Sequence, residues 1–123
     1  MADELSLGIA FQLLDKFANE WEPTQDLSLL IDMTGNVISS GVQQIGTSKE
    51  NLTLLSDHST LGWALFMNLD DANYVSYGVD ADNPFGEMKA GEPGCCRLSR
   101  AVSNVSMKAN TAACWVAYIV LED

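Results

Sequence analysis

The chain has few of the residues that catalytic sites usually need. It contains one histidine, His58, and three cysteines among 123 residues. With a single histidine there is almost no scope for a Ser-His or Cys-His pair, and His58 in "LLSDHST" is predicted to lie exposed in a polar turn. The sequence also lacks G-x-S-x-G, H-E-x-x-H and a phosphate-binding glycine loop. The carboxylate pairs Asp70-Asp71 and Glu122-Asp123 are expected to be solvated, so we expect no enzyme and no cofactor.

Basic residues are also scarce. Six Lys and Arg face seventeen Asp and Glu, which gives a net charge of −11. This charge repels nucleic acid and anionic membranes, and no apolar run reaches the roughly 18 residues of a transmembrane helix. The first residues, "MADELSLGIAFQLLDKF", are acidic where a secretory signal is basic. We therefore expect a protein made in the cytoplasm, with neither nucleic acid nor membrane as a partner.

The three cysteines do not form a recognisable framework. Cys95 and Cys96 are adjacent, Cys114 stands alone, and none is in C-x-x-C spacing. We predict reduced, buried thiols that act as small apolar residues. The alternative is a bridge from Cys95 or Cys96 to Cys114 or to another subunit.

What the chain does have is alternation of apolar and polar residues. Leu5, Leu7, Ile9 and Phe11 alternate with small or polar residues, which predicts a strand with one buried face. Similar patterns or β-prone runs recur in segments 27–33, 37–46, 61–69, 74–79, 85–94, 95–102, 105–109 and 114–121. A short helical turn is predicted only in 47–55. The pattern indicates one all-β domain over residues 1–123, an antiparallel sandwich or jelly roll of about nine short strands. Residues 1–23 are either its first strand or an extended N-terminal arm.

The segment "YGVDADNPFGEM", residues 77–88, resembles a calcium loop at first sight. Counting from Asp80, Asp82 matches the third position of an EF-hand, but Pro84 and Phe85 occupy the fifth and sixth. The motif therefore fails, and no metal site is expected. We predict a solvated loop between strands, with a weak cation site as the alternative.

The three tryptophans differ in their surroundings. Trp63 and Trp115 lie in the two most apolar segments, which favours a core or subunit-interface position, whereas Trp21 in "FANEWEP" is expected to be exposed. An exposed Trp21, or Tyr74 and Tyr77, would also suit a sugar-stacking platform, so a host-glycan-binding module remains an alternative.

An ordered set of segments resembles a known family. The segments are "GVQQIGTSKENLTL", "GWALFMNLDDANYVSYG", "FGEMKAGEPGCCRLSR" and "MKANTAACWVAYIVLED". Together they are similar to small virion proteins of tailed bacteriophages, in which NLD-x-x-NYV-x-x-G precedes a K-x-GE turn, an RL strand and a closing A-x-TAA…Y-I-x-x-ED strand. The similarity covers roughly residues 41–123. The pair Cys95-Cys96 departs from it, because plain apolar residues are expected there.

The resemblance implies a virion structural protein with a β-sandwich fold, present in many copies. We expect a capsid decoration or cement protein on the outer capsid surface, with the major capsid protein and itself, as a trimer, as its partners. A tail, neck or fibre position is the alternative within the virion. The residues expected at interfaces are Leu5, Leu7, Ile9, Phe11, Trp21, Trp63, Phe66, Asp80, Asp82 and Phe85.

Overall fold

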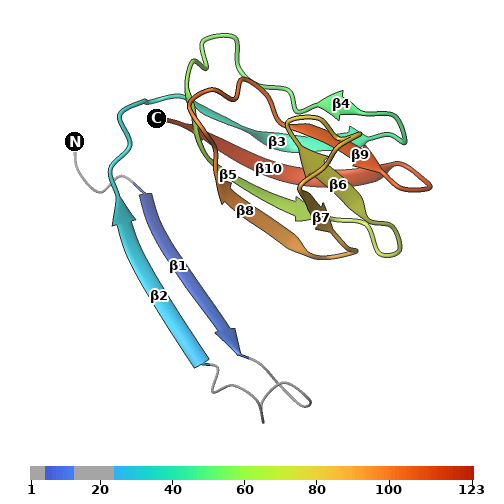
Figure 1. Cartoon of the computed structure of the whole chain (residues 1–123), viewed down its shortest axis with the longest axis horizontal. Helices are drawn as coiled ribbons and strands as arrows, with labels where there is room; N and C mark the ends of the chain where they lie inside the picture. The colour runs from blue at the N-terminus through green and yellow to red at the C-terminus, as the bar shows by residue number, and fades with distance from the viewer. Residues whose placement is uncertain (1–4, 13–23) are drawn as a thin grey trace. The chain divides into compact units, whose positions relative to one another are not determined.

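The fold consists of strands only within the described part of the chain. The computed structural model describes residues 5–12 and 24–123, with the side chains of residues 5, 6, 8 and 31–123. Ten strands are formed there, and the chain divides into two units, residues 1–34 and 35–123 (Figure 1). In the second unit two antiparallel four-stranded sheets form a small β-sandwich, which confirms the predicted fold class. No helix in the described residues is long and apolar enough to span a membrane.

The first unit contains a two-stranded antiparallel ribbon. Strand β1 (Leu5–Gln12) pairs with β2 (Thr24–Ile31), and the register sets Leu7 opposite Leu29 and Ile9 opposite Leu27. The predicted first strand is confirmed. The expected arm ended at residue 23, between these paired strands, so the ribbon continues past that boundary.

Two sheets of four strands make up the second unit. The strands are β3 (Ile38–Ile45), β4 (Glu50–Asn51), β5 (Leu61–Asn68), β6 (Val75–Gly78), β7 (Gly86–Met88), β8 (Pro93–Arg97), β9 (Ser106–Ala109) and β10 (Cys114–Glu122). The long sheet has the order β3-β10-β5-β8 and the short sheet the order β4-β9-β6-β7. All pairings are antiparallel, as expected from the short connections.

The core lies between the two sheets. On β10 every second residue, including Val116, Tyr118 and Val120, is buried, and β5 contributes Ala64 and Phe66 in the same way. These side chains meet residues of the short sheet, namely Val75, Met88, Met107 and Ala109. Burying each large apolar side chain contributes about 1.5–3 kcal/mol, so the period-two pattern of these strands is what closes the sandwich.

The helical turn predicted in 47–55 is wrong. Glu50, which was expected to support a helix cap, lies in the two-residue strand β4 and accepts hydrogen bonds from the Gly46 N–H (3.1 Å) and the Gln43 amide (3.1 Å). The following residue Leu52 is buried and donates its N–H to the Val105 carbonyl (2.9 Å). These contacts with distant residues override the weak local preference for helix.

Side chains of the long sheet hold the segment that follows β4. The Gln43 amide donates to the Asn51 carbonyl (3.0 Å) and accepts from the Thr53 N–H (2.9 Å). The Tyr118 hydroxyl donates to the Thr53 carbonyl (2.7 Å), and Ser39 Oγ accepts from the Leu55 N–H (2.9 Å). These backbone groups of residues 51–55 therefore form hydrogen bonds with side chains, and not with a neighbouring strand.

A buried asparagine organises one end of the sandwich. The side chain of Asn68, at the end of β5, is 0% exposed. Its Nδ2 donates to the carbonyls of Asn73, Met88 and Lys89 at 2.9–3.1 Å, and its Oδ1 accepts from the Asp70 N–H (3.0 Å). One amide thus joins β5 to the β5–β6 loop and to the turn between β7 and β8.

We predict that Asn68→Ala destabilises the protein by about 3 kcal/mol or more, because several buried backbone groups lose their partner and each costs about 1–3 kcal/mol. The measurement is urea unfolding followed by intrinsic fluorescence. Asn83→Ala is the matched control, since Asn83 is exposed and makes one long hydrogen bond to Asp80 (3.4 Å). Equal stability of the two variants would contradict the role given to Asn68.

Candidate interaction surface

The strands of the long sheet direct every second residue away from the core. These residues form what we call the outer face: Ile38, Ser40, Val42 and Gln44 of β3; Trp115, Ala117, Ile119 and Leu121 of β10; Trp63, Leu65 and Met67 of β5; Pro93, Cys95 and Arg97 of β8. The register aligns them in rows across the sheet, such as Val42, Ala117, Met67 and Pro93. The alternation that builds the core therefore also builds a second, outward surface.

This outer face is apolar and uncharged to an unusual degree for a solvated sheet. Five large apolar side chains on it are 40–57% exposed: Ile38, Val42, Met67, Trp115 and Ile119. None of its residues is acidic, although the chain has seventeen Asp and Glu. Its one charged residue, Arg97, is paired with Asp123. Contiguous exposed apolar surface of this kind marks an interaction site.

A shallow groove runs over the centre of the outer face. It has a volume of about 410 Å³ and is lined by Val42, Leu65, Met67, Ala117 and Ile119, among others. Ala117 is the small residue on the central strand β10, and larger side chains flank it. Trp115, two residues away on the same strand, is 51% exposed. An exposed ring thus lies next to a hollow.

The apolar residues expected at interfaces lie in different parts of the structure. Trp63 lies half-buried on the outer face, and its buried Nε1 has no hydrogen-bond partner. Phe66 is only 4% exposed and packs in the core, although it also borders the groove, so its interface role stays a prediction. Of the two positions expected for Trp115, its 51% exposure leaves the interface position and not the core. Trp21 and the side chains of Leu7, Ile9 and Phe11 lie outside the described residues, while Leu5 begins β1 and is half-buried.

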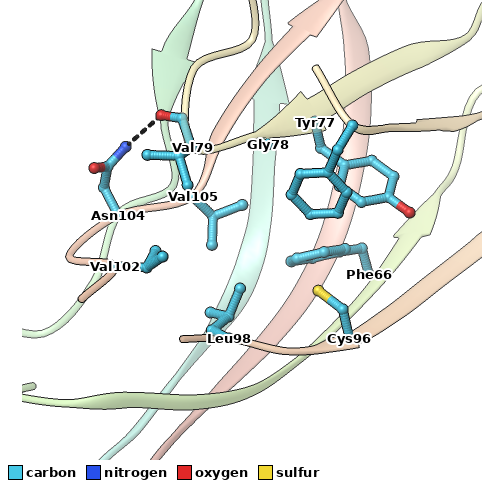
Figure 2. Close-up of a pocket in the computed structure, with 10 residues that line it drawn as sticks. Phe66, Tyr77, Gly78, Val79, Cys96, Leu98, Val102, Asn104 and Val105 are labelled. Atoms are coloured by element: carbon cyan, nitrogen blue, oxygen red, sulfur yellow. Dashed lines mark hydrogen bonds between the residues drawn. The ribbon is translucent and has the colours of Figure 1, made fainter. Parts of the chain in front are cut away.

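Phe85 is exposed but anchored. Its side chain is 65% exposed, and its ring meets Tyr77 edge-on with centroids 5.4 Å apart. Tyr77 in turn packs against Phe66, also at 5.4 Å (Figure 2). The apolar pocket beside these rings has about 10 Å³ of free space, room for about one water molecule, and therefore holds no ligand. Because Tyr77 is half-buried and the rings of Phe66 and Phe85 contact its own, Tyr77 is a poor sugar platform. The same burial raises the pKa of the Tyr77 hydroxyl.

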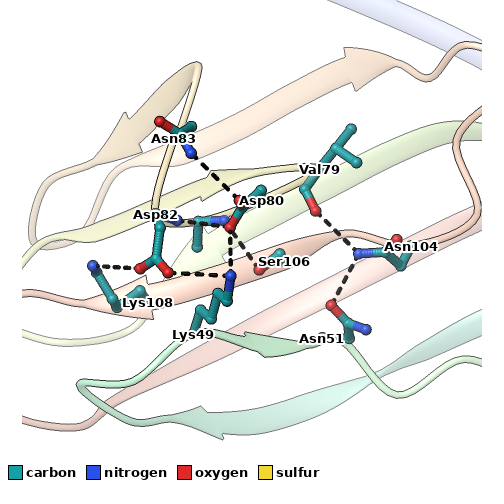
Figure 3. Close-up of polar contacts among 10 residues, drawn as sticks. Lys49, Asn51, Val79, Asp80, Asp82, Asn83, Asn104, Ser106 and Lys108 are labelled. Carbon is teal, nitrogen blue, oxygen red and sulfur yellow. Dashed lines mark hydrogen bonds and ion pairs between the residues drawn. The ribbon is translucent and has the colours of Figure 1, made fainter.

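Asp80 and Asp82 are paired with lysines of the same chain. Lys49 Nζ lies 3.1 Å from Asp80 Oδ1 and 3.1 Å from Asp82 Oδ2, and Lys108 Nζ lies 3.0 Å from Asp82 Oδ1 (Figure 3). The Asp82 N–H and Lys49 lower the pKa of Asp80, and the two lysines lower the pKa of Asp82. The loop does connect β6 to β7, as predicted.

A lysine ammonium thus occupies the position between Asp80 and Asp82 that the alternative assigned to a metal cation. Among the residues that the structure describes, no group of three or more His, Cys, Asp or Glu could hold a metal ion. The weak cation site is therefore not supported. The loop is also less negative than its sequence indicates, since two lysines balance its two aspartates.

His58 is not the exposed loop residue that the sequence predicts. Its ring is half-buried, and Nδ1 lies 2.7 Å from the Oγ of Ser39. This is a serine–histidine contact, but Ser39 is 2% exposed and its Oγ already accepts the Leu55 N–H. A hydroxyl buried and bonded in this way cannot reach a substrate, so the pair holds the loop 53–58 against β3.

The C-terminal carboxylates are likewise structural. Glu122 was expected to be solvated, but its carboxylate accepts hydrogen bonds from the Asn36 N–H (3.2 Å), the Ser59 N–H (2.9 Å) and the Ser59 hydroxyl (3.0 Å). These donors, the Ser59 N–H first, lower the pKa of Glu122 below its usual 4.5. Asp70 behaves similarly, because the N–H groups of Asn73 and Ala72 lower the pKa of its carboxyl.

The three cysteines are free thiols. Cys114 is buried, as predicted, and Cys96 is half-buried against the core. Cys95 is exposed on the outer face, which corrects the prediction for that residue. Partial burial raises the pKa of the Cys95 thiol, so it is not an activated nucleophile.

Glu122→Gln tests the C-terminal anchor through pH. The folded-state pKa of Glu122 lies below the unfolded value, so its stabilisation is complete above about pH 4.5 and is lost as pH falls through the folded pKa. We expect Glu122→Gln to be less stable than the natural protein at pH 7 and the difference to shrink towards pH 3. Thermal unfolding across this range measures it, with the exposed Glu87→Gln as control. A difference that is independent of pH would contradict the assignment.

Comparisons with known proteins add no family to this description. No protein-family model matches the chain, and neither the curated proteins nor the solved structures gave a significant match.

Proposed function

We propose that the protein is a structural protein of a tailed-phage virion and that it decorates the outer surface of the capsid. The support is a small β-sandwich with an exposed, uncharged apolar sheet face, together with the ordered segments that resemble small virion proteins. The protein is made in the host cytoplasm and acts on the particle. Its partners are the major capsid protein and further copies of itself.

The outer face is the observation that carries this proposal. A sheet face with five half-exposed large apolar residues and no acidic residue costs free energy in water until a partner covers it. Most of the polar groups that could suggest catalysis form hydrogen bonds or ion pairs within the chain. Ser39 Oγ bonds His58 Nδ1, Asp80 and Asp82 pair with lysines, and Glu122 accepts hydrogen bonds from backbone amides, whereas His58 Nε2 is buried without a hydrogen-bond partner. The arrangement favours an interaction protein over an enzyme.

The ribbon of the first unit is the segment that we assign to the capsid. A two-stranded ribbon is only marginally stable alone in water, so β1 and β2 gain from pairing with or packing on another surface. Its register pairs apolar residues across the strands, Leu5 with Ile31, Leu7 with Leu29 and Ile9 with Leu27. An edge of this ribbon suits strand addition to a capsid subunit, in which main-chain hydrogen bonds give the affinity.

Clamping explains how such binding stabilises a shell. A decoration protein that spans neighbouring capsid subunits binds the assembled lattice and not the separated subunits. By mass action, each bound copy then shifts the equilibrium towards the intact shell. Several weak contacts on one lattice add up to tight retention.

Deleting residues 1–31 tests the assignment of the ribbon. The core cluster of the sandwich comes from residues 45–120, so the truncated chain is expected to keep its far-UV CD spectrum and cooperative unfolding. Cosedimentation with particles that lack the protein should show binding of the full chain and loss of at least about 100-fold in affinity for the truncated one. Asn83→Ala in the full chain is the control. Retained binding by the folded truncation would show that the ribbon is not the capsid contact.

The position in the virion needs a separate measurement. Quantitative mass spectrometry of purified particles should give a copy number comparable to that of the capsid subunits, and a reconstruction should show density on the outer shell. A few copies per particle would point to the tail or neck instead. Absence from the particle, with binding to a glycan array that Trp21→Ala removes, would favour the host-glycan module.

A further inference from the structure

We propose that the outer face of the long sheet binds the same face of a second copy of this chain and forms a two-fold symmetric dimer. The inference concerns the sandwich of residues 35–123 and does not depend on the virion assignment. A face-to-face pair takes the place of the expected trimer.

Charge is the first argument for a second copy. Each chain carries a net charge of −11, so two copies repel each other over most of their surfaces. The outer face has no acidic residue, and its arginine is already neutralised by Asp123. A partner recognised through charge would need charged groups on this face. Because the face is neutral and apolar, it suits a partner surface that is also neutral and apolar, and the same face of a second copy is such a surface.

Shape is the second argument. The exposed ring of Trp115 stands beside the groove over Ala117, on the same strand. In a two-fold contact the same patch of both copies meets, so an exposed ring beside a groove is self-complementary. The Trp115 ring of each copy can then enter the groove of the other. A cyclic trimer would require two different patches, whereas this one face carries five of the ten exposed large apolar side chains of the described residues and the other five are spread over loops.

Size is the third argument. The four strands have 8, 9, 8 and 5 residues; at a spacing of about 4.8 Å and a rise of about 3.3 Å per residue they outline a face of roughly 475 Å². A specific interface of standard size buries about 800 Å² on each partner, and side-chain relief adds to the flat outline. The outer face therefore provides most of what a dimer of moderate affinity needs.

A matched pair of variants tests the proposal in the full-length chain. Val42 is 56% exposed on the edge strand β3, where it lines the groove of the outer face, and Val79 is 51% exposed after β6, away from that face. Sedimentation velocity over a range of concentrations should show a dimer for the natural protein. Val42→Glu should raise the dimer dissociation constant at least about 100-fold, because a two-fold contact buries the new charge twice. Val79→Glu should leave the constant within about 3-fold of the natural value.

Two further measurements separate this contact from others. Trp115→Ala should weaken the dimer at least tenfold, as expected when a central aromatic anchor is removed. Raising the salt concentration should strengthen the dimer, since salt screens the repulsion between the two acidic chains. A natural protein that stays monomeric or forms a trimer, equal effects of the two glutamate variants, or a dimer that dissociates in salt would each overturn the proposal. Far-UV CD of each variant confirms that the sandwich is folded.

Discussion

The buried amide of Asn68 is the contact on which the architecture of the sandwich depends. β5 is a central strand of the long sheet, and at its end the chain must cross to the short sheet through a loop. Where the chain crosses between the sheets, buried carbonyl groups need hydrogen-bond donors from outside the strand ladders. The side-chain amide of Asn68 supplies them, because it donates to the carbonyls of Asn73, Met88 and Lys89. Neighbouring groups extend the network: Asp70 accepts the N–H groups of Ala72 and Asn73, and Asn110 exchanges hydrogen bonds with the backbone of Tyr74.

Three segments of the sequence supply this network. The segment NLD-x-x-NYV supplies Asn68, Asp70 and Asn73. The K-x-GE segment forms the adjacent turn, in which Lys89 accepts the Glu92 N–H and Gly91 has a positive φ of 74°. The A-x-TAA segment supplies Thr111, whose hydroxyl donates to Asn73 Oδ1 (2.6 Å). The residues of these segments therefore determine how the two sheets are connected, whereas the residues of the outer face take no part in this network.

Local patterns in the sequence predict the strands but not the contacts between residues that are far apart in the chain. Strands such as β5 and β10 were predictable because apolar alternation is local and strong. The bonds of His58 to Ser39, of Glu122 to Ser59 and of Lys49 to Asp80 join residues 19, 63 and 31 positions apart, and no local pattern indicates them. The residues of the outer face were not predictable for another reason. On β10 the residues of both parities are apolar, so composition alone could not show that Val116 faces the core and Trp115 the solvent.

The acidic charge and the apolar outer face are best understood together. Charge repulsion between two chains extends over a Debye length of about 8 Å at physiological ionic strength, whereas apolar contact acts only when surfaces touch. A chain with a net charge of −11 therefore resists approach in most orientations, and surfaces free of acidic residues offer the weakest resistance. The β6–β7 loop also has a reduced local charge, because Lys49 and Lys108 pair with its aspartates. That loop, however, presents a single exposed ring, Phe85. Only the outer face of the long sheet combines low charge with extended apolar area among the described residues, so charge selects the orientation in which the apolar surface can act.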